Sequence, residues 1–213
     1  MEYTIGVNIM SNNKTKYLVI TTFFMAIILL QVLIPWLGYI PLGAVIVGAQ
    51  PTIIQFTVAI AAILLGARRG AFIGGFWGLL TLWQAWSTPG SIGSLMFQNP
   101  FTAFIPRILV GLIIGMAFNK WLRNKNFGFR TLGLGFLGGL AALINTVGVV
   151  LLTVIGFTVM RTNFTGIPNH NLLGWLIGIV SFNSIFEIIT GIILVAAIGN
   201  VLVPIAERAG IKG

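Results

Sequence analysis

Residues able to do acid–base or metal chemistry are scarce in this chain of 213 residues. Its carboxylates are Glu2, Glu187 and Glu207, its one histidine is His170, and it contains no Asp and no Cys. General acid–base catalysis usually needs a pair of tuned groups, and zinc sites need several His, Cys or acidic ligands. No G-x-x-x-x-G-K-[ST] loop is present to bind ATP. The sequence therefore predicts no catalytic residues, no metal site and no cofactor.

The strongest chemical candidates are polar side chains that interrupt long apolar segments. Arg107 lies near the start of one such segment, Asn145 lies inside a second, and Asn183 and Glu187 lie inside a third. An ionisable side chain at membrane depth costs about 2.5–3.5 kcal/mol on insertion scales, so it is a functional candidate by default. If Arg107 faces inward, its guanidinium is suited to a substrate carboxylate. If it faces outward, its long side chain reaches the membrane surface.

We expect the two amides to lie near Arg107. Asn145 is about 13 residues into its segment and Asn183 about 11 into the next, which places both just below the level of Arg107. Trp83, Gln84 and Trp86 lie at the end of the apolar segment 71–86, which we expect on the same side of the membrane as Arg107. Together these residues predict a binding site for a small polar ligand, in which the guanidinium and the amides bind the ligand and the tryptophan rings line the site. The alternatives are interhelical hydrogen bonds for the amides and an interfacial aromatic belt for the tryptophans.

The positions of Glu187 and His170 are each compatible with more than one role. Glu187 follows Asn183 by four residues, so the two share one helical face. It suits an ion-pair partner, a structural acceptor or a proton carrier, and we favour the structural role. His170 lies between two asparagines in an outer loop, where it is either solvated or in contact with a ligand. We include His170 among the candidate binding residues.

The composition indicates the environment in which these side chains act. Hydrophobic residues make up 57% of the chain and charged residues 7%, whereas a soluble domain carries about 25% charged residues. The chain is therefore predicted to be an all-α integral membrane protein. Since a span takes about 20 residues, we expect six transmembrane helices in one compact bundle. The segments are 17–34, 52–65, 71–86, 105–122, 132–159 and 172–203. The second and third are short, and we expect their ends to extend into the flanking loops.

The basic residues indicate the orientation of the bundle. Ten of the 12 lysines and arginines fall on one side of the expected spans, and only Arg107 and Arg161 fall on the other. The positive-inside rule then places both termini in the cytoplasm. This distribution accounts for the net charge of +9 without a nucleic-acid partner. We expect a flexible cytoplasmic N-terminus over 1–16, a membrane domain over 17–205 that binds substrate, and a cytoplasmic tail over 206–213.

Glycines recur at four-residue spacing in several spans. The pairs and triplets are Gly70, Gly74 and Gly78, then Gly111 and Gly115, Gly135 and Gly139, and Gly174 and Gly178. Such small-residue stripes let helices approach closely inside a membrane. They predict packing within the bundle, or, for one stripe, docking of a partner helix.

Three stretches carry a resemblance to a known family. They are residues 65–74 (LGARRGAFIG), residues 143–147 (LINTV), and the segment from Asn183 to Glu187. With the size and the six-helix layout, they make the chain similar to the substrate-binding S components of energy-coupling factor (ECF) vitamin transporters. The resemblance implies a multi-pass protein of the bacterial plasma membrane. Such a protein binds a vitamin from outside and associates with a transmembrane coupling protein and two cytoplasmic ATPases.

The resemblance also suggests a docking surface and a substrate. Family members often carry a small-x-x-x-small motif in the first helix that docks the coupling protein; here Thr22 and Ala26 have that spacing. The asparagines of the last two spans look most like pantothenate-type members. Arg107 would then bind the carboxylate of pantothenate, and Asn145 and Asn183 its amide and hydroxyls. A riboflavin- or folate-specific S component, or an autonomous secondary transporter that uses Glu187, are the alternatives.

Overall fold

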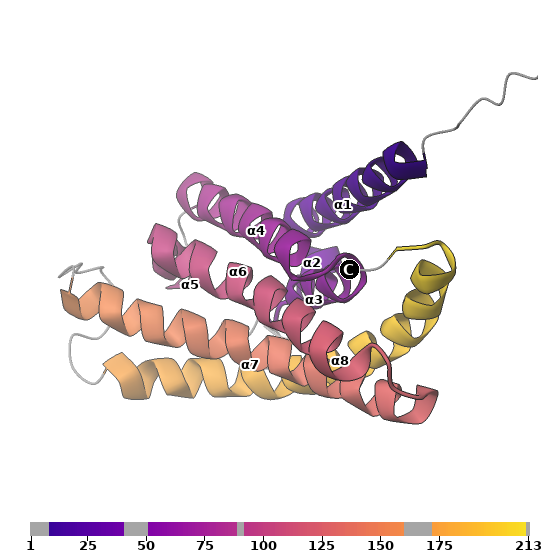
Figure 1. Cartoon of the computed structure of the whole chain (residues 1–213). Coiled ribbons are helices and arrows are strands. Elements are labelled where there is room, and N and C mark those ends of the chain that lie inside the picture. The colour runs from indigo at the N-terminus through magenta and orange to yellow at the C-terminus, as the bar shows by residue number, and fades with distance from the viewer. Residues whose placement is uncertain (1–8, 41–50, 89–91, 160–171, 212–213) are drawn as a thin grey trace, which may run out of the picture.

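The computed structural model describes residues 9–40, 51–88, 92–159 and 172–211, and in these residues it contains helices and no strand. Figure 1 shows the long helices arranged as a bundle. They are α1 (Ile9–Leu33), α3 (Ile54–Leu65), α4 (Ala67–Ser87), α6 (Pro100–Ala117), α7 (Phe127–Val159) and α8 (Leu172–Arg208). Shorter elements are α2 (Pro35–Gly38), α5 (Ile92–Phe97) and the π-helix η2 (Phe118–Leu122).

Helix length and hydropathy confirm a helical membrane protein. Four stretches within the described residues are long and apolar enough to cross a bilayer: Lys14–Leu33, Pro100–Leu122, Phe127–Gly156 and Asn183–Arg208. The long helices lie where the apolar segments predicted them. Helix α4 extends past both ends of segment 71–86, as expected.

Three helix boundaries differ from the sequence-based expectations. Helix α1 begins at Ile9, so it includes residues 9–16 of the expected N-terminal segment. Helix α8 continues to Arg208, beyond the predicted boundary at 205. Helix α3 does not extend: its 12 residues correspond to about 18 Å, which is less than the hydrocarbon thickness of about 30 Å. Residues before α3 pair with the chain after α2, and Gly66, at φ 88°, ends the helix.

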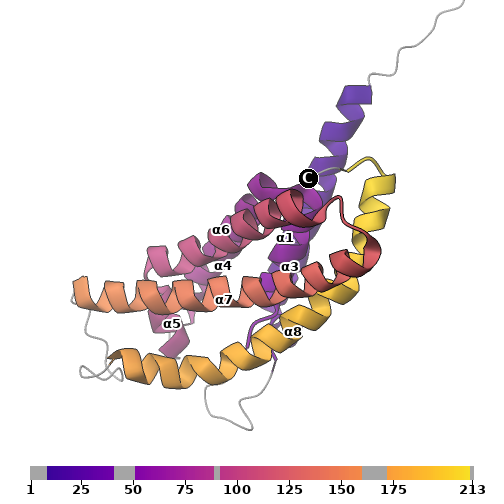
Figure 2. The same ribbon diagram turned by 60° about the horizontal axis from the view of Figure 1, so that its bottom comes forward.

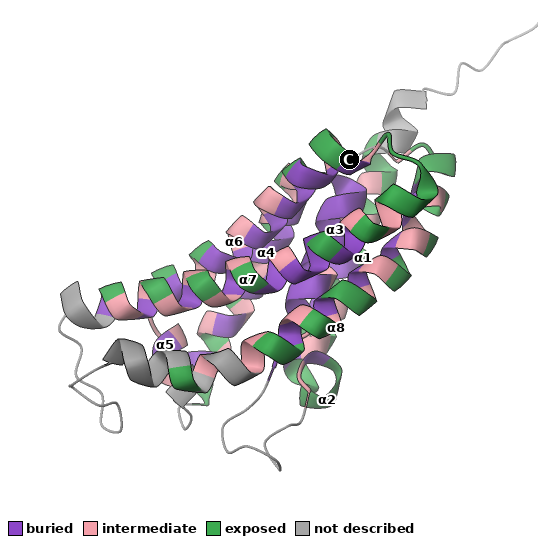
Figure 3. Cartoon of the chain, turned by 90° about the horizontal axis from the view of Figure 1, so that it is seen from below, coloured by how far each residue is buried: buried purple, intermediate pink, exposed green. Residues whose placement is uncertain are grey.

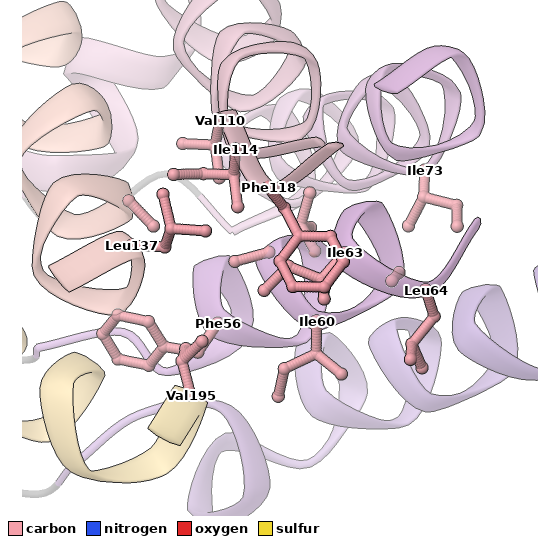
Figure 4. Close-up of a cluster of buried hydrophobic side chains, with 14 of the residues drawn as sticks. Phe56, Ile60, Ile63, Leu64, Ile73, Val110, Ile114, Phe118, Leu137 and Val195 are labelled. Carbon is pink, nitrogen blue, oxygen red and sulfur yellow. The ribbon is translucent and has the colours of Figure 1, made fainter. Parts of the chain in front are cut away.

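Helix α3 forms the centre of the hydrophobic core. Every α3 residue except Thr57 is buried, as expected for a helix that is apolar on all sides. Figure 4 shows its side chains packed against those of α4, α6, η2, α7 and α8. Figure 3 shows the reverse distribution on α1 and α8, where exposed residues follow the outward faces. The short helix is thus enclosed by longer ones.

The glycine stripes of α4 and α6 pack against each other. A Cβ on Gly70 would meet the carbonyl oxygen of Gly111 at 2.8 Å, and one on Gly74 would overlap the backbone of Arg107. In the same way, Gly138 of α7 lies directly against Gly191 of α8. The interpretation as packing within the bundle is therefore confirmed for the predicted stripes of α4 and α6, whereas a Cβ on Gly178 of α8 would meet nothing within 4 Å. The close approach of α4 and α6 brings the backbone of Arg107 against α4.

Candidate functional site

Polar side chains are buried inside the otherwise apolar bundle. They come from five helices and are, in chain order, Gln55, Thr81, Thr102, Arg107, Asn145, Thr153 and Glu187. Asn183 of α8 is half-buried. Because buried polar groups are expensive unless they are paired, this set is the candidate functional site.

Arg107 faces into the bundle. Its exposed fraction is 2%, and its guanidinium carbon lies 4.3 Å from the ring centroid of Phe97 and 4.9 Å from that of Trp77. The alternative in which Arg107 reaches outward to the membrane surface is therefore excluded. Two aromatic faces hold the cation at a fixed position, in the arrangement of a cation–π contact.

The local sequence of α6 explains how Arg107 is held. Asn99 caps the helix by accepting from the backbone N–H of Phe101 at 3.0 Å, and Pro100 follows at the first helical position. Pro106 lies inside the helix and has no N–H, so the carbonyl of Thr102 lacks its helical donor. Nη1 of Arg107 donates to that carbonyl at 2.7 Å. The Nε of Arg107 has no acceptor among the described residues.

Several buried oxygens of the bundle also lack partners among the described residues. A Cβ on Gly156 would meet the side chain of Asn99, and one on Gly148 would meet Pro106. Helices α6 and α7 therefore run antiparallel, side by side as in Figure 2, with Thr153 level with Thr102. Oxygens without a hydrogen-bond partner in the described part of the chain are Gln55 Oε1, Thr102 Oγ1, Asn145 Oδ1, Thr153 Oγ1 and Asn183 Oδ1. Buried polar atoms are usually bonded, so this group is equipped to accept from a ligand.

Glu187 is the one acidic residue among the buried side chains of the described residues. Its exposed fraction is 6%. Oε1 accepts from the backbone N–H of Thr52 at 2.9 Å, and Oε2 accepts from Gln55 Nε2 at 3.1 Å and from Thr146 Oγ1 at 3.3 Å. The three hydrogen bonds fit the structural acceptor role.

The structure corrects the prediction that the side chains of Trp83 and Trp86 line the site. Their exposed fractions are 54% and 65%, whereas Trp77 is 2% exposed and packs on Arg107. The buried face of α4 repeats every three or four residues, and Trp83 and Trp86 fall on the opposite face. Their exposure suits the interfacial belt instead. Gln84 is half-buried.

The remaining predicted residues lie away from the buried polar set or are not described. Thr22 and Ala26 are exposed on α1. His170 lies outside the described residues, as does Arg161.

Sequence reasoning missed several groups of the site. Gln55 is the one amide side chain in the apolar segment 52–65. Thr102 lies four residues before Pro106, so its carbonyl is the one that the proline leaves without a helical hydrogen bond. Both signals were available. Phe97 lies on α5, outside every predicted span, and carried no signal.

The structure shows a polar set buried among apolar helices, and comparison with known sequences defines the class of the protein. The sequence profile described as "ECF transporter, substrate-specific component" matches residues 16–199. The chain belongs to this family, whose members are membrane-embedded bacterial transporter components rather than enzymes. A relative is the "Pantothenic acid transporter PanT" of Lactococcus lactis subsp. cremoris (strain MG1363). It is 34% identical over 163 residues, which cover 70% of this chain and 76% of the relative.

Proposed function

We propose that this chain captures pantothenate at the outer face of the membrane and delivers it inward. The observation that carries the proposal is Arg107, a buried cation whose Nε has no acceptor among the described residues, together with buried oxygens of the same bundle that also lack partners there. Pantothenate offers a carboxylate to the guanidinium, and it offers hydroxyls and an amide N–H to the oxygens. The name of the Lactococcus relative supports the same substrate.

Riboflavin fits this site less well. It has no carboxylate for Arg107. The tryptophans expected to stack on a flat ring system, Trp83 and Trp86, are exposed. Folate carries more than one carboxylate, and Arg107 is the only cation among the buried side chains of the described residues. A monoanion with several donors is therefore the favoured ligand.

We propose six membrane crossings with both termini in the cytoplasm, and we assign the second crossing to α3, although its 12 residues alone are shorter than the hydrocarbon thickness. The ten-to-two division of the basic residues supports this orientation. We propose that a transmembrane coupling protein and two cytoplasmic ATPases supply the energy, because the matching family is that of the substrate-specific component of ECF transporters. We place contact with the coupling protein on α1, where Thr22 and Ala26 are exposed side by side.

A thermal-shift panel tests the substrate. The purified protein is heated with pantothenate, riboflavin or folate, each at the same concentration. Binding to the folded state stabilises it by about 2.7 kcal/mol when the ligand is at 100 times its Kd. We expect a raised melting temperature with pantothenate alone. A shift with riboflavin and none with pantothenate would refute the assignment.

Trp77→Phe is expected to weaken pantothenate binding by about fivefold. Phenylalanine keeps the aromatic face but interacts more weakly with the guanidinium, and cation–π contacts are worth about 0.5–2 kcal/mol. Trp83→Phe is the matched control on the same helix, because that indole is exposed. Calorimetric titration of the two variants checks the difference. Equal losses in both would show that Trp77 has no special part in holding Arg107.

A further inference from the structure

A short paired segment lies beside the site. Tyr39 and Thr52 form an antiparallel bridge, with backbone hydrogen bonds from Ile40 to Pro51 and from Ile53 to Gly38, both at 2.9 Å. Because these bonds flank the bridge, Tyr39 and Thr52 are a non-hydrogen-bonded pair. In such a pair the N–H of Thr52 points away from Tyr39 and needs another acceptor.

That acceptor is supplied by a distant helix. Backbone polar groups inside a membrane protein must be satisfied internally, and irregular backbone is tolerated only where protein surrounds it. Oε1 of Glu187, on α8, accepts from the N–H of Thr52. Its other oxygen accepts from Gln55 on α3 and Thr146 on α7. One carboxylate thus joins the segment before α3 to three helices.

We propose that Glu187 is a positioning residue whose hydrogen-bond acceptors, rather than its charge, hold the Tyr39–Thr52 pair against the site. The pair lies beside the buried polar set, since Thr52 bonds to Glu187 and Tyr39 packs against the hydrophobic core that contains Trp77. The inference rests on the proposed function only for its second readout, which is pantothenate binding.

Two conservative substitutions of Glu187 distinguish the effect of its hydrogen-bond acceptors from the effect of its charge. Glu187→Gln keeps the reach of the side chain and loses its charge. One oxygen remains for Thr52, and the new amide N–H can donate to Oε1 of Gln55, which has no partner among the described residues. The hydroxyl of Thr146 can donate or accept. Glu187→Asp keeps the charge but is one methylene shorter, which carries the 2.9 Å contact with Thr52 beyond hydrogen-bonding range.

Hydrogen exchange of peptides covering residues 51–56, without ligand, is the first measurement. We expect exchange in Glu187→Gln within about threefold of the parent and exchange in Glu187→Asp faster by about tenfold or more, since a lost hydrogen bond is worth roughly one decade. Glu207→Asp, on the same helix but in a half-exposed ion pair with Arg130, should change nothing there.

Pantothenate affinity, the second measurement, should rank the variants in the same order, with Glu187→Gln close to the parent. If Glu187→Gln is impaired as much as Glu187→Asp, or if Glu187→Asp exchanges like the parent, the inference is overturned. Should the parent bind no pantothenate, the proposed function fails, while the exchange rates of the two variants still decide the role of Glu187.

Discussion

Replacing Arg107 by glutamine is expected to weaken pantothenate binding by about 150-fold, which corresponds to about 3 kcal/mol. Truncating one partner of a buried, hydrogen-bonded charge pair costs about 2–5 kcal/mol. Arg107 is the cation buried among the described side chains, and Phe97 and Trp77 fix its position. Glutamine removes the charge and the paired donors but retains a polar side chain.

Calorimetric titration of the purified variant measures this loss. Arg68→Gln is the matched control, because Arg68 is exposed at the start of α4 and its loss removes the same charge. Arg107→Lys should fall between the parent and Arg107→Gln, since lysine keeps the charge and loses the planar fork. If the Arg107→Gln variant binds pantothenate as tightly as the parent protein, the proposed contact between Arg107 and the pantothenate carboxylate is refuted.

Gly74→Ala is expected to destabilise the fold by about 3 kcal/mol, at the upper end of the usual cost of overpacking. A Cβ at this position would overlap the carbonyl group of Arg107. Backbone cannot move aside as a flexible side chain does, so α4 and α6 must separate. We also expect weaker pantothenate binding, because that separation displaces the segment that carries Arg107.

Gly75→Ala is a control one residue away. Its Cβ would lie 3.6 Å from the Ile108 side chain, an ordinary contact, and alanine favours helix over glycine by about 1 kcal/mol. Its melting temperature should equal or exceed that of the parent protein, while that of Gly74→Ala falls well below. Equal melting temperatures for the two variants would contradict the close packing of α4 on α6.

The polar residues within apolar segments were the most informative part of the sequence. Burying Arg107, Asn145 or Asn183 in a membrane protein is costly, so each needs a reason to be there. The structure buries Arg107 and Asn145 and half-buries Asn183. Hydrophobic length likewise located the long helices, because crossing the hydrocarbon requires a long apolar run.

Rotation about each helix axis was harder to predict. Inside a bilayer both faces of a helix are apolar, so the period of hydrophobicity that marks the inner face of a soluble helix is weak. Trp83 and Trp86 were therefore expected at the site, whereas Trp77 is the buried indole. The hydrogen bond from Gln55 to Glu187 joins residues 132 positions apart, and such pairing depends on the tertiary fold.

Equilibrium binding of radiolabelled pantothenate to the purified protein measures directly whether the chain captures this vitamin. We expect saturable binding of one pantothenate per chain at submicromolar free ligand, displaced by unlabelled pantothenate but not by riboflavin or folate. Binding should be lost in Arg107→Gln and retained in Arg68→Gln. Absence of saturable binding by the folded parent protein, or equal binding by the Arg107→Gln variant, would contradict it.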